Sequence, residues 1–376
     1  MTPHNALASD WAEWLRLEQT PGVGPETARQ LLAAFGLPSQ IFAADFTTLS
    51  KVVSAKVAKA LLQPDSGQLQ QRIELTRTWC AQPGNQVLTW ADANYPRALL
   101  DIPDPPVLIY VKGRLALLDA PTIAVVGSRN ATAQGIRNAE QFSEALSKAG
   151  LTISSGMAAG IDAAAHHGAL RGAGSTVAVI GTGADIVYPA RNRALAHLIA
   201  DGGCIVSEYP LGMPAIASNF PRRNRLISGL AKGVLVIEAA AQSGSLITAR
   251  MAAEQGRDVF AIPGSIHSPL AKGCHQLIKQ GAKLVDTAQD ILDELRFLPL
   301  MRPVAASSTQ ATSASLSDIV SADQRLLDAI GYDPVHVDHL VERIAMDVAE
   351  LSGVLLTLEL DGHIEQLPGG MVKRIG

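Results

Sequence analysis

Short apolar segments alternate with helical segments from residue 122 to about residue 296, and this alternation constrains the fold more than any other feature. Strands buried on both faces of a sheet have this composition, and helical crossovers between them are typical of parallel pairing. The sequence therefore predicts an α/β fold with a doubly wound, mostly parallel, Rossmann-like sheet. We expect its strands at Thr122–Val126, Leu151–Ser154, Thr176–Ile180, Cys204–Ser207, Val234–Ile237, Val259–Ile262 and Lys283–Val285.

The first 70 residues have a helical pattern that is interrupted by the turn Pro21-Gly22-Val23-Gly24-Pro25. Glycines permit a tight turn and Pro25 suits a first helical position, so we predict a helix-hairpin-helix (SAM-like) domain over residues 1–70. Leu49–Leu62 resembles a degenerate second copy. The first hairpin either offers backbone N–H groups to a phosphate or only packs, and both interpretations stay open. We expect residues 71–120 to connect this domain to a core domain over residues 121–300.

Residues 301–317 are small, polar and aperiodic, which predicts a flexible linker. From Ser317 to Gly376 there are eleven acidic residues against four basic ones, a net charge of −7, which leaves a net charge of +3 for the rest of the chain. Because these acidic groups repel phosphates, we interpret the tail as a protein-interaction module or as one that adds little to DNA affinity. Its pattern over residues 318–376 predicts a winged helix, with helices at Ala322–Ile330, His336–Arg343 and Asp347–Glu359 and a hairpin at His363–Val372.

The chain has 376 residues, of which 47% are hydrophobic, and its net charge is −4. This charge argues against a generally basic coat, so a nucleic-acid site would be a local patch. Cys80, Cys204 and Cys274 lie far apart in the sequence, which suggests neither a zinc site nor an oxidising compartment. Met1–Asp10 lacks a signal-peptide pattern, and no apolar stretch is long enough to span a bilayer. We therefore expect a cytoplasmic protein without membrane insertion and without a metal ion.

Ligands of open α/β sheets collect beyond the carboxyl ends of the strands, so the loops after the predicted strands form the candidate site. Glycine and serine dominate these loops and let backbone N–H groups approach an anion, and the following helices add a favourable dipole. Both a mononucleotide and a nucleic-acid backbone fit such a rim. The loop residues that we expect to bind are Gly127, Ser128, Ser155, Gly156, Gly160, Ser243 and Gly244.

Six arginines fall in these loops or just after them, and they favour a nucleic-acid strand over a single nucleotide. Guanidinium groups bind phosphates bidentately and stack on bases, and a single nucleotide rarely needs so many of them. The alternative for each is a surface charge or an ion-pair partner. The six are Arg129, Arg191, Arg193, Arg222, Arg223 and Arg225, and we expect Arg129, Arg191, Arg222 and Arg223 to contact DNA together with Asn224.

Signals for catalysis are weak. Gly181-Thr182-Gly183 lacks the third glycine of the dinucleotide fingerprint, and the sequence contains no P-loop motif. His166, four residues after Asp162, is interpreted as fixing the start of a helix. Glu238, at a strand end, is either a general base or a carboxylate that anchors a loop. Since no nucleophile with a paired base is found, we expect a binding protein with no catalytic residue and no cofactor.

In these loops the sequence resembles the DprA/Smf family of DNA-processing proteins, over roughly residues 95–295 and in the family's order. Each matching stretch alone is unspecific, but their combination is specific. The N-terminal helical domain and the winged-helix tail also fit the larger members of the family. The matching stretches are Val126–Arg129, Ser155–Asp162 with His166, Gly181–Asp185 with Tyr188-Pro189, Ser207–Pro210, Phe220–Arg225, Glu238-Ala239 with Ser243–Leu246, Glu254–Arg257 and Gly273–Leu284.

The resemblance implies an extended Rossmann fold that binds incoming single-stranded DNA without sequence specificity during natural transformation. It further implies loading of RecA onto that strand, protection of the strand from nucleases and displacement of single-strand-binding protein. It also implies a homodimer through the last helix and strand of the fold, with His275, Leu277, Ile278 and Leu284 in the interface.

Two other functions stay open at this point. Rossmann-like folds with a Ser-Gly-Ser loop, such as Ser243-Gly244-Ser245, also occur in phosphoribohydrolases that cleave nucleoside monophosphates. The excess of arginines and the missing catalytic pair count against such a nucleotide-processing enzyme. The third possibility is a scaffold whose partners are all proteins.

Overall fold

The computed structural model describes residues 11–64, 67–296, 326–327, 330, 334–344 and 347–375. The chain divides into two compact units, residues 1–300 and residues 301–376, which are described separately. The expected linker over residues 301–317 lies outside the described residues. Within the described part of the chain, no helix is both long enough and apolar enough to cross a lipid bilayer.

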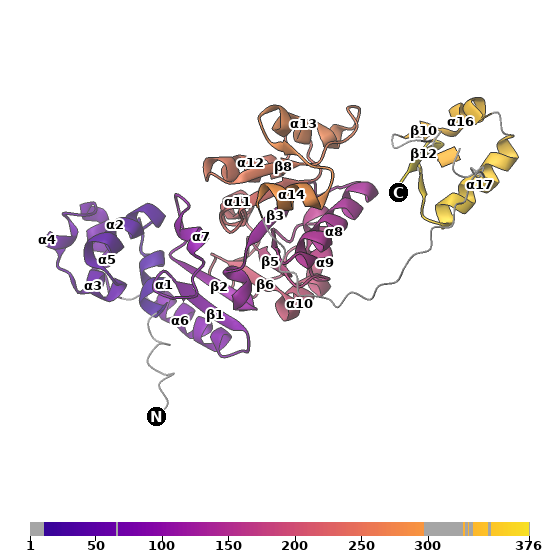
Figure 1. The fold of residues 1–376 in the computed structure, drawn as a ribbon. Helices are drawn as coiled ribbons and strands as arrows, with labels where there is room; N and C mark the ends of the chain where they lie inside the picture. Colours follow the sequence, from indigo (N-terminus) through magenta and orange to yellow (C-terminus); the bar gives the residue numbers. More distant parts are fainter. Residues whose placement is uncertain are drawn as a thin grey trace, which may run out of the picture. The chain divides into compact units, whose positions relative to one another are not determined.

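The first unit is built on one nine-stranded sheet with the order β1-β2-β6-β5-β4-β3-β7-β8-β9 (Figure 1). The seven strands from β3 to β9 pair in parallel, which confirms the predicted doubly wound α/β fold. All seven were expected from the apolar segments, and their bounds differ from the prediction by one residue at most. They are β3 (Thr122–Val126), β4 (Thr152–Ser155), β5 (Thr176–Val179), β6 (Cys204–Ser207), β7 (Gly233–Val236), β8 (Asp258–Ala261) and β9 (Lys283–Leu284).

Residues 71–120, expected to connect the helical domain to the core, also contain two strands that the sequence did not predict. They contribute β1 (Asn85–Thr89) and β2 (Leu108–Gly113), and β2 pairs antiparallel with β6 and so extends the core sheet. The physical reason is that β2 is apolar on both faces, so that Ile109 and Tyr110 are both almost fully buried. Around these strands lie α6 (Gly67–Cys80), α7 (Arg97–Leu100) and the 3-10 helix η2 (Leu115–Leu118).

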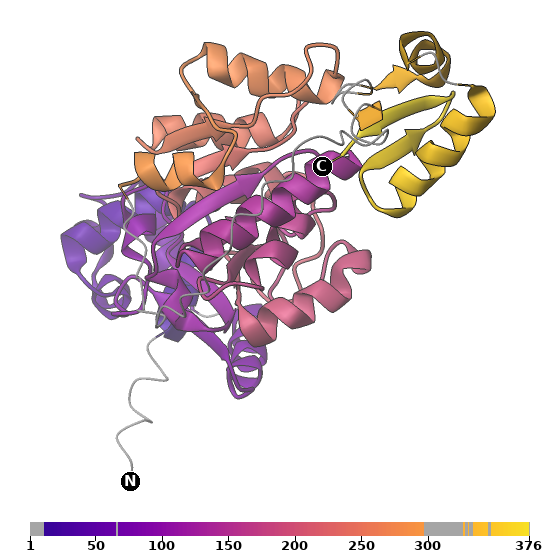
Figure 2. The same ribbon diagram turned by 45° about the vertical axis from the view of Figure 1, so that its right-hand side comes forward.

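Helices cover both faces of the sheet (Figures 1 and 2). In β3, Ile123 and Val125 face one helical layer while Ala124 and Val126 face the other, as expected for a strand buried on both sides. The first layer consists of α8 (Ala133–Lys148), α9 (Ile161–Ala169), α10 (Arg193–Gly202) and α14 (Ala288–Glu294), and the second of α11 (Asn219–Gly229), α12 (Ser245–Glu254) and α13 (Lys272–Lys279).

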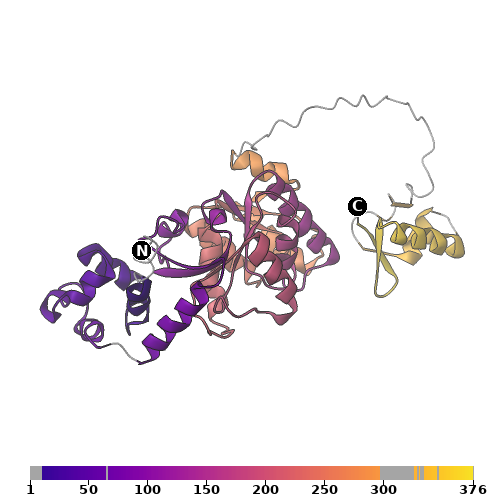
Figure 3. The same ribbon diagram turned by 90° about the horizontal axis from the view of Figure 1, so that it is seen from below.

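The N-terminal helices lie at the β1 end of the sheet (Figures 1 and 3). The predicted hairpin joins the first two of them: Gly22 has a φ of +88°, and Pro25 occupies the first helical position. Trp14 and Leu31 of this domain belong to the same buried cluster as Tyr110 of β2. The helices are α1 (Trp11–Gln19), α2 (Pro25–Phe35), α3 (Pro38–Ala43), α4 (Phe46–Leu49) and α5 (Ala55–Leu61).

A cavity of about 510 Å³ lies between the helical domain and the sheet, and we call it the acidic cavity. Glu18, Glu26, Asp104 and Glu208 line it together with a single guanidinium group, that of Arg222. Beside it, Glu208 also accepts two hydrogen bonds from the buried guanidinium of Arg225, at 2.8 and 2.6 Å.

The second unit has the architecture predicted for a winged helix. Its small sheet has the order β10-β12-β11 and packs against two helices (Figure 1). Of the helix expected at Ala322–Ile330, the structure describes Leu326, Leu327 and Ile330, which are helical and buried. The elements are β10 (Val335–His336), α16 (Val337–Ile344), α17 (Val348–Leu360), β11 (Ile364–Leu367) and β12 (Met371–Arg374).

We predict that Glu208→Gln lowers the free energy of unfolding by about 3 kcal/mol, because it leaves the buried guanidinium of Arg225 without its main counter-charge. Glu74→Gln is the matched control: Glu74 pairs with Arg77 at the surface, where both side chains are more than half exposed, and the expected change is below about 1 kcal/mol. Urea denaturation of both variants measures the difference. Equal losses in the two variants would contradict the prediction.

We also predict that Glu18 makes the stability depend on pH. Burial raises the pKa of Glu18 to about 7, and Arg72 opposes this effect. Since the folded-state pKa lies above the unfolded value, the stabilisation is present at low pH and is lost as the pH rises through about 7. Glu18→Gln should therefore gain stability relative to the parent between about pH 5 and about pH 8 in urea denaturation. A constant difference between parent and variant over this range would contradict the raised pKa.

Candidate functional site

A cavity of about 500 Å³ lies at the carboxyl end of the sheet, and we call it the site cavity. It is centred on β3, which pairs with β4 on one side and with β7 on the other, so it occupies a point where the strand order reverses. The loops after β3, β4 and β7 and the start of α11 form its wall. Seven of the expected binding residues line it: Gly127, Ser128, Arg129, Arg223, Asn224, Ser243 and Gly244.

Arg129 is the exposed cation of the site cavity. It follows β3 directly, and no salt bridge joins it to any residue that the structure describes. The next residue, Asn130, donates its backbone N–H to Ser128 Oγ at 3.1 Å, which fixes the turn. The guanidinium of Arg129 is therefore free to bind an anion.

Ser155, Gly156 and Gly160 support the site cavity but do not line it. Ser155 is fully buried, and its Oγ donates to the carbonyl of Val125 at 2.7 Å. Gly160 has a φ of +76°, and a Cβ there would lie 2.3 Å from the carbonyl oxygen of Ser128. The lack of a side chain at Gly160 thus lets the loop after β4 pack closely on the loop after β3. The predicted contact of these three residues with a ligand stays a prediction.

The segment Phe220–Arg225 was expected in a rim loop or just after one, and the structure places it in a helix. These residues form the first turns of α11, where Pro221 is tolerated because it lies in the first turn. Successive side chains on a helix point about 100° apart. The arginines of the segment therefore diverge and do not form one cluster.

Arg223 points into the protein and is only 4% exposed. Its Nη1 donates to the carbonyls of Gly156 and Val179, at the ends of β4 and β5. Burial lowers its pKa to about 10, and the charge of Asp162 opposes this effect. The guanidinium of Arg223 thus links the ends of β4 and β5 beside the site cavity. Its predicted contact with DNA stays a prediction.

Arg222 and Arg191 do not line the site cavity. Arg222 is half exposed and lines the acidic cavity, where its Nε lies 3.9 Å from Glu208 Oε1. Arg191 is exposed in the 3-10 helix η3 (Ala190–Asn192). Of the four arginines expected to contact DNA, only Arg129 and Arg223 line the site cavity, and the contacts of Arg191 and Arg222 with DNA stay predictions.

Three residues that the sequence prediction left out shape the site cavity. Asp162 lines it and is nearly buried; burial raises the pKa of its carboxyl group, and the guanidinium of Arg223 opposes this. Phe220 also lines it, with its ring 5.3 Å from that of Tyr188. Asn192 Nδ2 donates to the carbonyls of Met157 and Ala158 and so fixes the loop after β4. An aromatic residue just before two arginines was the signal that could have identified Phe220.

Glu238 and His166 have structural roles. Glu238 accepts hydrogen bonds from the backbone N–H and the hydroxyl of Thr132, at 2.9 and 2.6 Å, and thereby anchors the loop before α8. This confirms the loop-anchoring alternative. His166 does not fix the start of a helix as expected, because it lies buried inside α9 with Nδ1 2.7 Å from Thr176 Oγ1. Burial lowers its pKa to about 3, so it stays neutral.

The residues expected in a dimer interface lie on α13 and β9. Leu284 on the edge strand β9 is 48% exposed, and His275 and Ile278 are partly exposed. Leu277 is 9% exposed and packs in the core of its own sheet. The interface itself stays a prediction.

Comparison with protein-family models covers most of the chain. Residues 86–296 match DNA recombination-mediator protein A, residues 307–370 match the DprA winged helix domain, and residues 15–63 match a SAM-like helix-hairpin-helix tandem.

Curated relatives and solved structures agree with these matches. The chain is 44% identical over 302 residues to protein Smf of Escherichia coli, which covers 80% of each protein, and 50% identical over 206 residues to DprA of Streptococcus pneumoniae, which covers 55% of this chain and 73% of the relative.

The crystal structure of S. pneumoniae DprA superposes with a TM-score of 0.66 at 39% identity, covering 75% of this chain and 97% of that one. A Helicobacter pylori DprA structure, described for its single-stranded DNA binding mode, has a TM-score of 0.51 at 29% identity and covers 56% and 96%. The chain therefore belongs to the DNA recombination-mediator protein A (DprA/Smf) family.

Proposed function

We propose that this protein binds single-stranded DNA through the site cavity, without sequence specificity, in natural transformation and homologous recombination. The observation that carries the proposal is that Arg129, Asn224 and the amide-rich loops after β3 and β7 meet in one cavity. Exposed guanidinium and backbone N–H groups bind phosphates, and Phe220 offers a ring on which a base of any identity can stack. The H. pylori relative, whose structure concerns single-stranded DNA binding, supports the same ligand.

The proposal includes loading of RecA onto the bound strand, protection of that strand, and displacement of single-strand-binding protein by a homodimer. These parts rest on membership of the family, whose DprA and Smf names denote DNA-processing proteins. A RecA strand-exchange assay in the presence of single-strand-binding protein tests them. Addition of the chain should shorten the lag, and an unchanged lag would contradict RecA loading.

We further propose that the protein catalyses no reaction of its own. Ser243 and Ser245 in the site cavity hydrogen-bond to each other at 2.8 Å, and Glu238 is engaged by Thr132. Neither hydroxyl is therefore paired with a general base among these groups. Release of a base from nucleoside monophosphates would instead favour a phosphoribohydrolase-like enzyme.

We predict that Arg129→Ala combined with Asn224→Ala weakens binding of single-stranded homopolymers about tenfold or more, equally for all base compositions. The slope of log affinity against log salt should become shallower by about 0.7 per lost phosphate contact. Fluorescence anisotropy measures both quantities. Arg193→Ala, which removes an exposed arginine from α10 that does not line the site cavity, is the control. If the double variant bound like this control, the site assignment would be wrong.

We also predict that Gly160→Ala disturbs DNA binding without removing any group that contacts DNA. The new Cβ would lie 2.3 Å from the Ser128 carbonyl and would push the two loops apart. We expect a loss of stability of about 2 kcal/mol together with weaker binding. Gly212→Ala is the matched control, since Gly212 has a φ of +78° and no neighbour near the new Cβ. Thermal melting and anisotropy should show a smaller destabilisation and unchanged affinity for this control.

A further inference from the structure

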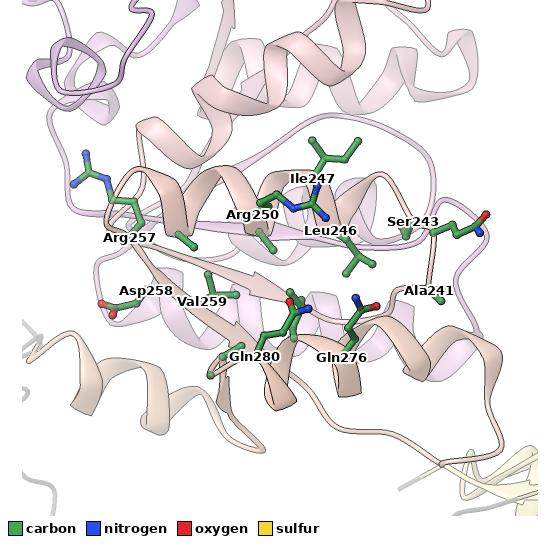
Figure 4. A pocket seen from close by; sticks show the side chains of 16 residues that line it. Ala241, Ser243, Leu246, Ile247, Arg250, Arg257, Asp258, Val259, Gln276 and Gln280 are labelled. Atoms are coloured by element: carbon green, nitrogen blue, oxygen red, sulfur yellow. The ribbon is translucent and has the colours of Figure 1, made fainter.

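A second cavity, of about 550 Å³, adjoins the site cavity between α12 and α13, and we call it the α12–α13 groove (Figure 4). The two cavities share Gln242, Ser243 and Ile247 as lining residues. A chain of nucleotides that leaves the site cavity over these residues therefore enters the groove directly.

The side chains of the groove suit nucleotides. Arg250 on α12 is exposed, and no salt bridge joins it to any residue that the structure describes. Gln276 on α13 and Gln280, which follows the last residue of α13, are four residues apart, and Figure 4 shows both pointing toward α12. Amide side chains donate to and accept from base edges, and a free guanidinium binds a phosphate. Ile247, which is 37% exposed, adds an apolar surface at the entrance.

Charge decides which way a strand leaves the site cavity. Beyond Arg222 lies the acidic cavity, whose four carboxyl groups outnumber the cations beside them, Arg222 and the buried Arg225, although burial raises the pKa of Glu18 to about 7. Two arginines and one aspartate line the α12–α13 groove, and of the two arginines only Arg250 is exposed, because the partly buried Arg257 donates to the carbonyl of Ala98. A phosphodiester backbone is repelled in the first direction and attracted in the second.

We propose that the α12–α13 groove continues the DNA site, so that Arg250 binds a backbone phosphate and Gln276 and Gln280 contact the bases of the nucleotides next to those in the site cavity. This inference rests on the proposed function. It adds a second subsite on α12 and α13, and it assigns the direction in which the strand runs across the protein.

The test compares full-length parent and variants on two lengths of oligothymidylate, about four and about twelve nucleotides, by fluorescence anisotropy. Only the longer strand reaches from the site cavity into the groove. Arg250→Ala should weaken binding of the longer strand about tenfold and make its salt slope shallower by about 0.7, with the shorter strand unaffected. Gln276→Ala with Gln280→Ala should also act on the longer strand alone, without changing the salt slope. Arg193→Ala is the control for loss of an exposed arginine, and it should leave both lengths unchanged.

Two results would overturn the inference. If the groove variants bind both strands like the parent, the groove serves another ligand, such as a partner protein. If they weaken both strands equally, their effect acts through the site cavity. Sedimentation of each variant identifies any loss of affinity that follows from dissociation of a dimer. Binding of the short strand by the parent, and its loss in the Arg129→Ala and Asn224→Ala variant, tests the proposed function separately.

Discussion

The placement of α11 depends on two buried guanidinium groups. Arg223 donates to carbonyls at the ends of β4 and β5, and Arg225 binds the carboxyl groups of Glu208 and Asp104. A buried guanidinium is costly unless its N–H groups and its charge are satisfied, so these partners fix both the depth and the rotation of the helix. Phe220 and Asn224, on the same turns, are thereby directed into the site cavity.

This arrangement limits the cations that a chain with a net charge of −4 offers to the proposed anion site. Arg223 and Arg225 are used internally, and Arg222 faces carboxyl groups. The exposed cationic surface of the site cavity is thus confined to Arg129, and backbone N–H groups of the glycine-rich loops supply the remaining attraction. Binding by a few cations, many amides and one aromatic ring is suited to a flexible single strand rather than to a rigid duplex groove.

The parallel strands were predictable because each is a short apolar run between helical segments, as Thr122–Val126 shows. The antiparallel strands β1 and β2 were not, since no helical crossover marks them and β6, which pairs with β2, is almost a hundred residues away in sequence. The loops after β3 and β7 were located correctly because strand ends determine them. The directions of Arg222, Arg223 and Arg225 could not be read from the sequence, because proline and asparagine made the start of α11 look like a loop. The sequence also could not decide where Leu277 packs, since an apolar residue in a helix fits a core and an interface equally well.

The helix-hairpin-helix turn illustrates how surroundings decide the use of a motif. Its backbone at Val23-Gly24-Pro25 lines the acidic cavity, beside Glu18 and Glu26. A phosphate that approached these N–H groups would meet four carboxyl groups, whose charge Arg222 and Arg225 balance only in part, and this repulsion opposes the dipole of α2. The structure therefore favours the packing interpretation of the first hairpin: the domain covers the β1–β2 side of the sheet through Trp14 and Leu31. The loops that carry the proposed anion-binding groups lie instead at the carboxyl end of the sheet, around the site cavity.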